Sequence, residues 1–514
     1  MMKIQNLIFL IVVFILTSGC NRNKLKTDEK SLVQTIRTKE EQLAYEQQVR
    51  EEHEKLLADS LAKLPKGFRF KEDRGVDPDH PPVVIDFTQK IPVKKFNLSE
   101  IATEVKYIRL SIPDDSLYFS PHMGGNVGFT NDDIILYNNF GVHRFSKTGA
   151  YIEPIANSNI RSRELSGQKL FGYFNKESYR GIWGNHVSVA GNRVLYKFTD
   201  YPNEKVTLFS YELSTASPTL QFPKVEERTD DGSFTKGETI ASGKEGYRSG
   251  TPGLSSTQIL GISSSFYAGV TSHLKASENG CMLATFNLQG DTLCKFTQFN
   301  KLKRPITSTL IRSVPSIINW KYNGMFSFRK SFSDTIFRLI PPNRLIPVYV
   351  FNLGSYKITD EDWYQTNLGL KNKIMIRSIL ETEKYVFISY TYYNQSGEHE
   401  NYKAVYNKLT ADICRLPISD KVTVAPKPQS SFAPPPKFYR PTKTFLNDID
   451  GGWPFWPSFT TPQGDMGMLV YPEYFKSYLE KTEIDETNEK VVKLKQFVKT
   501  LGSDTNERII MLVR

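Results

Sequence analysis

Two aspartates near the C-terminus have the spacing of oxygen ligands for a metal ion. Asp448 and Asp450 stand two positions apart and precede Gly451 and Gly452, and calcium loops use carboxylates at such alternate positions. The glutamate that completes a calcium loop is missing, because Phe459 occupies the twelfth position. Capping of an Asx turn is the commoner use of this pattern. Paired carboxylates also serve glycoside hydrolysis, but the sequence identifies no second acid for either residue.

An aromatic run follows these acids directly. Trp453, Phe455 and Trp456 alternate with prolines. Exposed rings of this kind would stack on a sugar or grip a peptide, whereas buried rings would pack between neighbouring sheets. We therefore take Asp448, Asp450, Trp453 and Trp456 as the candidate ligand-binding residues, with turn capping and core packing as the alternatives.

Motifs for catalysis or metal binding are absent from the sequence. None of the seven histidines forms an HxxxH or HxH pair, so their spacing predicts no metal site. The chain also has no nucleophile elbow, Walker loop or dinucleotide-binding motif in a strand–helix context. We therefore expect no catalytic residue, no metal and no cofactor, although distant histidines could still meet at a central channel.

A short apolar segment near the N-terminus ends at a cysteine. Lys3 precedes ten apolar residues, Leu7–Leu16, and the small residues Ser18 and Gly19 precede Cys20. Ten helical residues rise roughly 15 Å, about half of a bilayer core, so this segment resembles a signal peptide rather than a membrane span. The box before the cysteine is similar to bacterial lipoprotein signals, with an ordinary cleaved signal as the alternative.

This resemblance implies a location and a partner. Residues 1–19 are predicted to be removed and Cys20 to carry acyl chains, palmitate among them, which hold a protein stably at a membrane. We therefore expect a lipid-anchored protein of the cell envelope, in the outer membrane. The net charge of +11 favours anionic surfaces or glycans as partners, and no nucleic-acid-binding motif is present.

Between the anchor and the folded part, the sequence predicts a tether and a helical stalk over residues 20–64. Residues 31–64 contain neither glycine nor proline and are rich in helix-forming residues. Pro65 ends this stretch, and a globular domain is expected over residues 65–514.

Short strands separated by turn residues dominate from Val83 onward. Apolar strands that each lead to a turn and a further strand begin at six landmarks: Ile134, Val194, Met282, Met325, Tyr385 and Met468. The spacings of 60, 88, 43, 60 and 83 residues exclude a short repeat such as WD40. They suit six four-stranded sheets with long loops, the arrangement of a β-propeller. Two stacked sandwiches are the alternative.

The C-terminus adds two expected elements. Val491, Leu494 and Phe497 have helical spacing with lysines between them, which predicts an amphipathic helix on the propeller rim. Ile509–Val513 is expected to be a terminal strand that closes the ring by pairing with Val83–Phe87.

Several segments resemble one known family. Asn97–Ile101, Val105–Leu110, Ser333–Leu339 and Asn447–Gly452 are similar to segments of uncharacterised six-bladed β-propeller lipoproteins of gut-type anaerobic bacteria. The resemblance covers most of residues 83–514. It implies an all-β fold and an envelope location, but no established reaction.

The sequence therefore indicates a binding or interaction module for a protein or glycan ligand. The alternative is an envelope hydrolase or lyase that acts on glycans in the propeller channel, and a purely structural role also remains open. A hydrolase should bring several Asp, Glu or His side chains together, whereas a binding module should present an aromatic or basic patch.

Overall fold

The computed structural model describes most of the chain beyond residue 80, all of it within one compact unit, residues 55–514. The described residues are 72–74, 81–112, 126–139, 141–158, 179–213, 226–228, 233–244, 257–263, 265–271, 281–297, 317–330, 333–341, 343–359, 362, 370–417, 443–481, 487–502 and 507–514. Cys20, the signal peptide and the helical stalk lie outside these residues.

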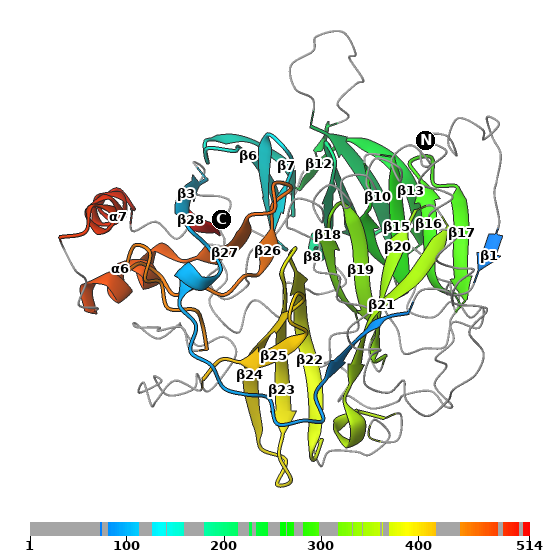
Figure 1. The fold of residues 1–514 in the computed structure, drawn as a ribbon. Coiled ribbons are helices and arrows are strands. Elements are labelled where there is room, and N and C mark those ends of the chain that lie inside the picture. Colours follow the sequence, from blue (N-terminus) through cyan, green and yellow to red (C-terminus); the bar gives the residue numbers. More distant parts are fainter. Residues whose placement is uncertain are drawn as a thin grey trace, which may run out of the picture. The chain divides into compact units, whose positions relative to one another are not determined.

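Six largely antiparallel sheets, here called blades 1 to 6, follow one another along the chain (Figure 1). Blade 1 contains β4 (Asn126–Phe129), β5 (Asp133–Tyr137), β6 (Gly141–Ser146) and β7 (Tyr151–Asn157). Blade 2 contains β8 (Arg180–Ala190), β9 (Arg193–Asp200), β10 (Lys205–Glu212) and β13 (Glu238–Lys244). Blade 3 contains β14 (Thr257–Gly261), β15 (Phe266–Thr271), β16 (Cys281–Asn287) and β17 (Thr292–Thr297).

The second half of the ring has the same construction. Blade 4 contains β18 (Ile317–Tyr322), β19 (Met325–Lys330), β20 (Thr335–Ile340) and β21 (Arg344–Asn352). Blade 5 contains β22 (Lys373–Glu381), β23 (Tyr385–Tyr393), β24 (His399–Asn407) and β25 (Asp412–Arg415). Blade 6 contains β26 (Phe459–Thr460), β27 (Met466–Val470), β28 (Glu507–Val513) and β3 (Val105–Ser111).

Apolar side chains join each blade to the next. Each pair of neighbouring blades shares a buried cluster, such as the one that contains Leu283 of blade 3 and Phe328 of blade 4. The cluster that contains Ile510 of blade 6 and Ile134 of blade 1 completes the circle. The fold is therefore an all-β six-bladed propeller with few helices, as the sequence predicted.

Five of the six sequence landmarks lie in the second strand of a blade. Met282 is the exception, because it lies in β16, the third strand of blade 3. The second strand of that blade is β15, whose small residues Ala268 and Gly269 and preceding serines give a weak strand pattern. This substitution accounts for the longest and the shortest of the predicted spacings.

The terminal strand closes the ring, but with a different partner from the predicted one. β28 pairs antiparallel with β3 from Val105↔Val513 to Ser111↔Glu507. The predicted partner, Val83–Phe87, instead contributes β2 (Val83–Asp86), which pairs parallel with β21 as a fifth strand of blade 4. Every side chain of β28 is buried, so it needs a partner strand of equal length. β2 is shorter and leaves Val83 and Val84 exposed, which suits an outer edge.

Segments of residues 72–111, here called the N-terminal strap, lie along the outer edges of four blades. β1 (Glu72–Arg74) pairs parallel with β17 of blade 3, and β2 lies on blade 4. Val93 then bridges Arg415 on blade 5 before β3 joins blade 6. Figure 1 shows the strap in blue beside blades 4 and 5. Added strands of this kind cover edges that would otherwise pair with another chain.

The outer edge of blade 1 is covered differently. The hairpin of β11 (Glu226–Arg228) and β12 (Phe234–Lys236) is inserted between β10 and β13 of blade 2, and β12 pairs with β7. Blade 2 thereby contributes part of the blade 1 sheet.

Helical elements lie outside the sheets. η1 (Leu98–Glu100) precedes β3 and η5 (Gly354–Tyr356) follows β21, while α6 (Pro472–Lys481) and α7 (Glu489–Lys499) lie between β27 and β28. On α7, Val491 and Leu494 are buried, and Leu494 belongs to the cluster between blades 5 and 6. No helix in the described residues has both the length and the apolar character that a membrane crossing needs.

Long connections gather on one face of the propeller. Successive strands of a blade are antiparallel, so the connections between blades share a face with those between the second and third strands of each blade. The ends of β7 and β25 and the starts of β8 and β26 lie at this face, here called the long-loop face. On the opposite face the turns are short except between β10 and β13. Asn323–Gly324 between β18 and β19 is an example, where both residues have positive φ angles typical of a type I′ hairpin.

Candidate ligand-binding site

Asp448 caps a short helix of the N-terminal strap. Its Oδ1 accepts the backbone N–H of Ser99 at 3.0 Å, and its Oδ2 accepts the Ser99 hydroxyl at 2.5 Å. Burial raises the pKa of Asp448, but these two hydrogen bonds outweigh it and hold the pKa below its usual range. The carboxylate thus joins the chain before blade 6 to η1, far away in the sequence.

Asp450 caps its own turn. Its Oδ1 accepts the backbone N–H of Gly452 at 2.9 Å and the hydroxyl of Tyr107 at 3.4 Å. Burial raises the pKa of Asp450. Gly451 has a φ angle of +67°, and a Cβ on Gly452 would lie 2.3 Å from the Tyr107 oxygen, so both glycines are needed for turn geometry. The two aspartates therefore bind different partners, as in the turn-capping alternative, and do not face a shared ion position.

Trp453 lies in the apolar cluster between blades 5 and 6 and α6. Its side chain is 3% exposed, and its ring meets those of Phe475 and Tyr478 edge-on at centroid distances of 6.1 and 5.4 Å. This is the packing arrangement that the sequence left as an alternative to sugar stacking.

Trp456 is also buried, but it lies against a charged group. Its ring is 8% exposed, stacks on Phe445 and meets Phe387 edge-on. The Nζ of Lys403 lies 4.9 Å from the ring centroid, within the range of a cation–π interaction. Lys403 belongs to β24 of blade 5, so this contact joins two blades.

The ammonium group of Lys403 is poorly compensated. Its side chain is partly buried, and no described residue accepts a hydrogen bond from Nζ or forms an ion pair with it. Burial lowers its pKa to about 8, and the charge of Lys443 contributes in the same direction. Among the residues that the structure describes, Trp456 is thus the stabilising contact for this charge. We call Lys403, Lys443 and Trp456 the Lys403 site.

Lys443, by contrast, is held by acceptors. Its Nζ pairs with Glu400 at 2.9 Å and donates to the backbone carbonyl of Asn401. The same ammonium lies 4.9 Å from the ring centroid of Tyr402, and the guanidinium of Arg415 lies 5.0 Å from it. Lys443 therefore lies near Lys403 with an acid partner of its own, Glu400, and shares the Tyr402 ring with Arg415.

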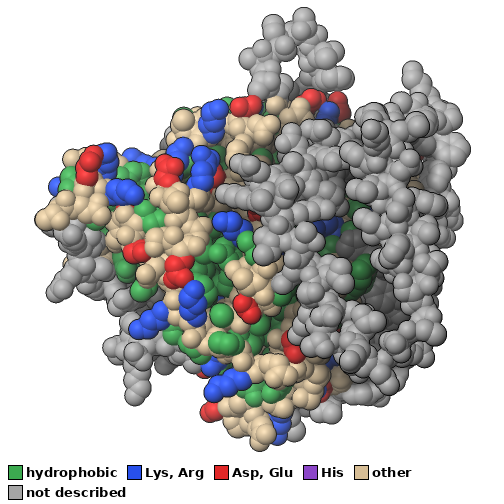
Figure 2. Space-filling model, in the orientation of Figure 1, with side chains coloured by type: hydrophobic (Ala, Val, Ile, Leu, Met, Phe, Trp, Pro, Cys, Tyr) green, Lys and Arg blue, Asp and Glu red, His purple; other side chains and the backbone are tan. Residues whose placement is uncertain are grey.

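The Lys403 site lies toward the long-loop face. β25 ends at Arg415, opposite Ala404, and the carbonyl of Lys403 accepts the backbone N–H of Leu416 just beyond that end. In Figure 2, hydrophobic side chains gather in the region of β25, β26 and β27, with Lys and Arg side chains around them. Lys403 was not among the residues predicted from the sequence. Its signal was a lysine two positions before the buried Val405, on the same face of β24.

Two other charged clusters are internally satisfied. In the first, Glu381 at the end of β22 is 1% exposed and accepts from Trp320, Arg338, Tyr349 and Lys408. Burial raises the pKa of Glu381, but Lys408 and Arg338 outweigh this effect and lower it to about 2. The cluster joins blades 4 and 5 and leaves no oxygen of Glu381 without a donor.

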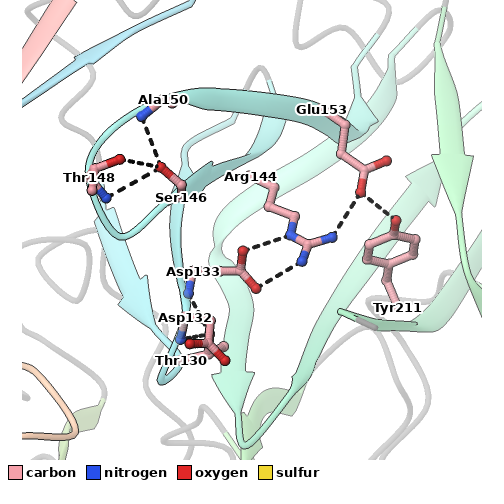
Figure 3. Close-up of polar contacts among 9 residues, drawn as sticks. All are labelled: Thr130, Asp132, Asp133, Arg144, Ser146, Thr148, Ala150, Glu153 and Tyr211. Carbon is pink, nitrogen blue, oxygen red and sulfur yellow. Dashed lines mark hydrogen bonds and ion pairs between the residues drawn. The ribbon is translucent and has the colours of Figure 1, made fainter. Parts of the chain in front are cut away.

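The second satisfied cluster joins blades 1 and 2 (Figure 3). Arg144 of β6 binds Asp133 through two hydrogen bonds of 2.9 and 3.0 Å and binds Glu153 at 3.3 Å. Glu153 also accepts the Tyr211 hydroxyl at 2.7 Å and pairs with Lys236 at 3.1 Å. Each carboxylate is thus matched by cations, which is the arrangement of a structural cluster.

Inner strands of three blades meet near the propeller axis. The Nζ of Lys321 in β18 donates to the carbonyl of Val189 in β8 at 2.6 Å. A Cβ on Gly128 of β4 would lie 2.3 Å from Val189 Cγ2, so the missing side chain of Gly128 makes room for Val189. Blades 1, 2 and 4 are therefore in contact at this level.

Acidic and histidine side chains do not converge in the described part of the chain. No group of three or more His, Cys, Asp or Glu residues there has the arrangement of a metal site. Cys294 and Cys414 do not form a disulfide. The described residues therefore present the Lys403 site, which is basic and aromatic, and acids such as Asp133 and Glu153 that are paired with cations.

The chain matches one known protein family. A family model described as a domain of unknown function, DUF4933, matches residues 65–481. The chain belongs to this family. DUF4933 membership and the propeller fold together confirm the resemblance to an uncharacterised propeller family, while the lipoprotein part of that resemblance stays a prediction. No curated protein matches the DUF4933 chain.

Several solved structures are similar to the chain at low identity. A DUF4221 family member from Bacteroides vulgatus aligns with 12% identity and a TM-score of 0.37, over 80% of this chain and 99% of its own. A quinonprotein alcohol dehydrogenase-like protein from Bacteroides thetaiotaomicron aligns with 11% identity and a TM-score of 0.25, over 57% and 65% of the two chains. A GH43_1 enzyme from Xanthomonas citri in complex with xylose aligns with 9% identity and a TM-score of 0.23, over 64% and 97%.

Proposed function

We propose that this protein is a lipid-anchored binding module of the cell envelope, whose protein or glycan ligand places an anionic group at the Lys403 site. The observation that carries the proposal is the state of Lys403. Its ammonium is partly buried beside a second cation, and no described residue accepts a hydrogen bond from it. A charge removed from water without a partner is costly, and an anionic ligand group supplies the missing partner.

Charge, rather than ring stacking, is the basis of recognition in this proposal. Trp453 and Trp456 are 3% and 8% exposed and are covered by other side chains, so neither offers a free ring face to a sugar. Trp456 acts instead as the apolar support beneath Lys403. A low-dielectric support of this kind strengthens the attraction between an ammonium and an incoming anion.

The glycan hydrolase or lyase alternative has less support. Such a reaction needs two carboxyl groups across a sugar. The buried acids Glu381 and Asp133 and the half-buried Glu153 are each bound by cations of the fold. No described feature favours catalysis over binding.

The location is proposed from the sequence. Acylation of Cys20 would hold the chain at the outer membrane, and the N-terminal strap would connect that anchor to four blades. A Cys20→Ala variant should leave the membrane fraction while residues 81–514 keep their thermal unfolding transition. If the variant stays in the membrane fraction, the anchor is wrong.

The binding proposal is tested with the full-length chain in detergent on an array of acidic and neutral glycans, together with acidic peptides. Wild-type protein should bind anionic members of the array, and Lys403→Met should lose that binding. Methionine is the matched replacement because it keeps the length and apolar contact over Trp456 and removes only the charge. Lys493→Met is the control, since Lys493 is an exposed lysine on α7 paired with Glu489. Equal binding by wild type and Lys403→Met, or preference for neutral ligands, would contradict the proposal.

A further inference from the structure

A second buried cation lies between blades 4 and 5. Arg329 is the penultimate residue of β19, directly opposite Ile318 of β18. Ile318 belongs to the apolar cluster that joins blades 4 and 5. Because β19 is the second strand of its blade, this end of the strand lies at the long-loop face. Arg329 therefore lies at the edge of the apolar interface between blades 4 and 5 that is nearest the long-loop face.

The guanidinium of Arg329 is nearly enclosed and has no acceptor among the described residues. The residue is 8% exposed, its Nε is buried without a hydrogen-bond partner, and no described residue accepts from either Nη atom. Arginine is rarely buried to this extent unless it is paired.

The nearest acid is bound by another cation. Asp334, which directly precedes β20, pairs through Oδ2 with Lys357 at 2.5 Å, and its Oδ1 is buried without a hydrogen-bond partner. Burial lowers the pKa of Arg329 to about 10, and the charge of Asp334 acts in the opposite direction. The charge of Asp334 thus acts on Arg329 although no hydrogen bond joins the two side chains. With Lys357 included, this group of three side chains has a net positive charge.

Two half-buried arginines of the propeller show what a structural role looks like here. Arg144 makes a two-pronged contact with Asp133, and Arg338, on the neighbouring strand β20, binds Glu381 and the Ser327 hydroxyl. Arg338 lies in the same interface between blades 4 and 5. The chain therefore supplies acceptors to arginines that hold blades together, and Arg329 differs from them.

We propose that Arg329 is an anion-binding residue, whose guanidinium donates through its Nη atoms to an oxyanion such as a carboxylate, phosphate or sulfate group. The planar guanidinium matches the two oxygens of such a group. The apolar cluster that contains the neighbouring Ile318 lowers the local dielectric constant and so strengthens the attraction. This site is separate from the Lys403 site, since Arg329 lies between blades 4 and 5 and Lys403 between blades 5 and 6.

The proposal is tested with the full-length chain and three probes, phosphate, sulfate and acetate, at constant ionic strength. Thermal unfolding measures the melting temperature, and titration calorimetry measures the affinity for each anion. The wild-type melting temperature should rise to a plateau with at least one of the three anions. The comparison among them distinguishes phosphate, sulfate and carboxylate ligands. Arg329→Met should bind that anion about 10- to 100-fold more weakly, as expected for loss of a charged hydrogen-bonding pair. Arg329→Lys should bind with intermediate affinity, because an ammonium keeps the charge but not the planar fork.

Two sets of controls distinguish anion binding by Arg329 from a structural role of this residue and from anion binding at the Lys403 site. Without added anion, Arg329→Met should melt no lower than wild type, because it removes an uncompensated buried charge. Arg193→Met, which removes an arginine already paired with Glu212, should keep the wild-type response to the anion, and so should Lys403→Met. The proposal is overturned if none of the anions gives a saturable rise in the wild type. It is equally overturned if Arg329→Met responds like wild type, or if this variant melts well below it without anion.

Discussion

Ile108 of β3 lies directly opposite Ile510 of β28, and this pair joins the two ends of the propeller sequence within one blade. Both side chains are buried in the cluster between blades 6 and 1. The ring is thus closed by a strand from each end of the propeller sequence.

A disulfide between these positions tests the closure. Opposite residues of an antiparallel pair have Cβ atoms about 4.5 to 5.5 Å apart, close to what a disulfide needs after small adjustments. The Ile108→Cys/Ile510→Cys variant should therefore form a cross-link under oxidising conditions, which mass spectrometry of the digested protein detects. Val84→Cys/Ile510→Cys is the control for the partner that the sequence suggested, and it should not cross-link.

Glu381 is predicted to stabilise the junction of blades 4 and 5. Glu381→Gln leaves Lys408 and Arg338 without their carboxylate, so the free energy of unfolding should fall by on the order of 3 kcal/mol. Urea unfolding followed by intrinsic fluorescence measures this change. Glu489→Gln, which removes an exposed pair on α7, should have little effect.

The contribution of Glu381 should also depend on pH in a defined direction. Its pKa is about 2 in the folded protein, against an ordinary value of 4.5, so the folded state binds this proton more weakly than the unfolded state. The stabilisation is therefore complete above about pH 4.5 and is lost as the pH falls toward 2. The stability gap between wild type and Glu381→Gln should close over that range, and a constant gap would show that charge does not explain it.

Lys403 should affect stability in a different, alkaline pH range. Its folded pKa of about 8 lies below the ordinary value of 10.5, so the unfolded state binds the proton more tightly between these values. The stability of wild type should therefore rise, relative to Lys403→Met, as the pH increases from 8 to 10.5. Below pH 8 the methionine variant should be the more stable protein, by on the order of 1 kcal/mol. A wild type that is more stable than Lys403→Met at neutral pH would mean that the ammonium already has a strong partner.

Tyr211 provides a test of the cluster in Figure 3. Tyr211→Phe removes the hydroxyl that donates to Glu153, while Lys236 and Arg144 keep that carboxylate paired. The loss of unfolding free energy should be about 1 kcal/mol, the usual value for one hydrogen bond. Chemical unfolding of the variant measures it, and a loss as large as that of Glu381→Gln would contradict the pairing described here.

The strands of most blades could be predicted from the sequence, but the strand that pairs with β28 to close the ring could not. Second strands such as Ile134–Tyr137 and Tyr385–Tyr390 carry continuous apolar and aromatic residues, and these patterns report burial locally. Val83–Phe87 and Val105–Leu110 both have strand patterns, however, and a pattern does not say which sheet a strand joins. That choice depends on the length and burial of β28 at the other end of the chain.

The candidate site was only partly accessible from the sequence for a similar reason. Asp448 and Asp450 have turn-capping patterns, and the pattern identified the turn but not the partners Ser99 and Tyr107. Trp456 was recognised as a candidate, but its contact with Lys403 joins segments from two blades. Lys403 lacks an acceptor only because of how those blades pack, and no local pattern encodes that.

Affinity for an anionic ligand, measured with and without the charge of Lys403, tests the central claim most directly. The anionic glycan or peptide that binds best on the array is titrated into wild type, Lys403→Met and Lys493→Met by calorimetry. Truncating one partner of a partly buried charge pair costs roughly 2 to 5 kcal/mol, so Lys403→Met should bind at least about 30-fold more weakly. Lys493→Met should match the wild type. Equal affinity of Lys403→Met and wild type would contradict the claim that this site holds the ligand.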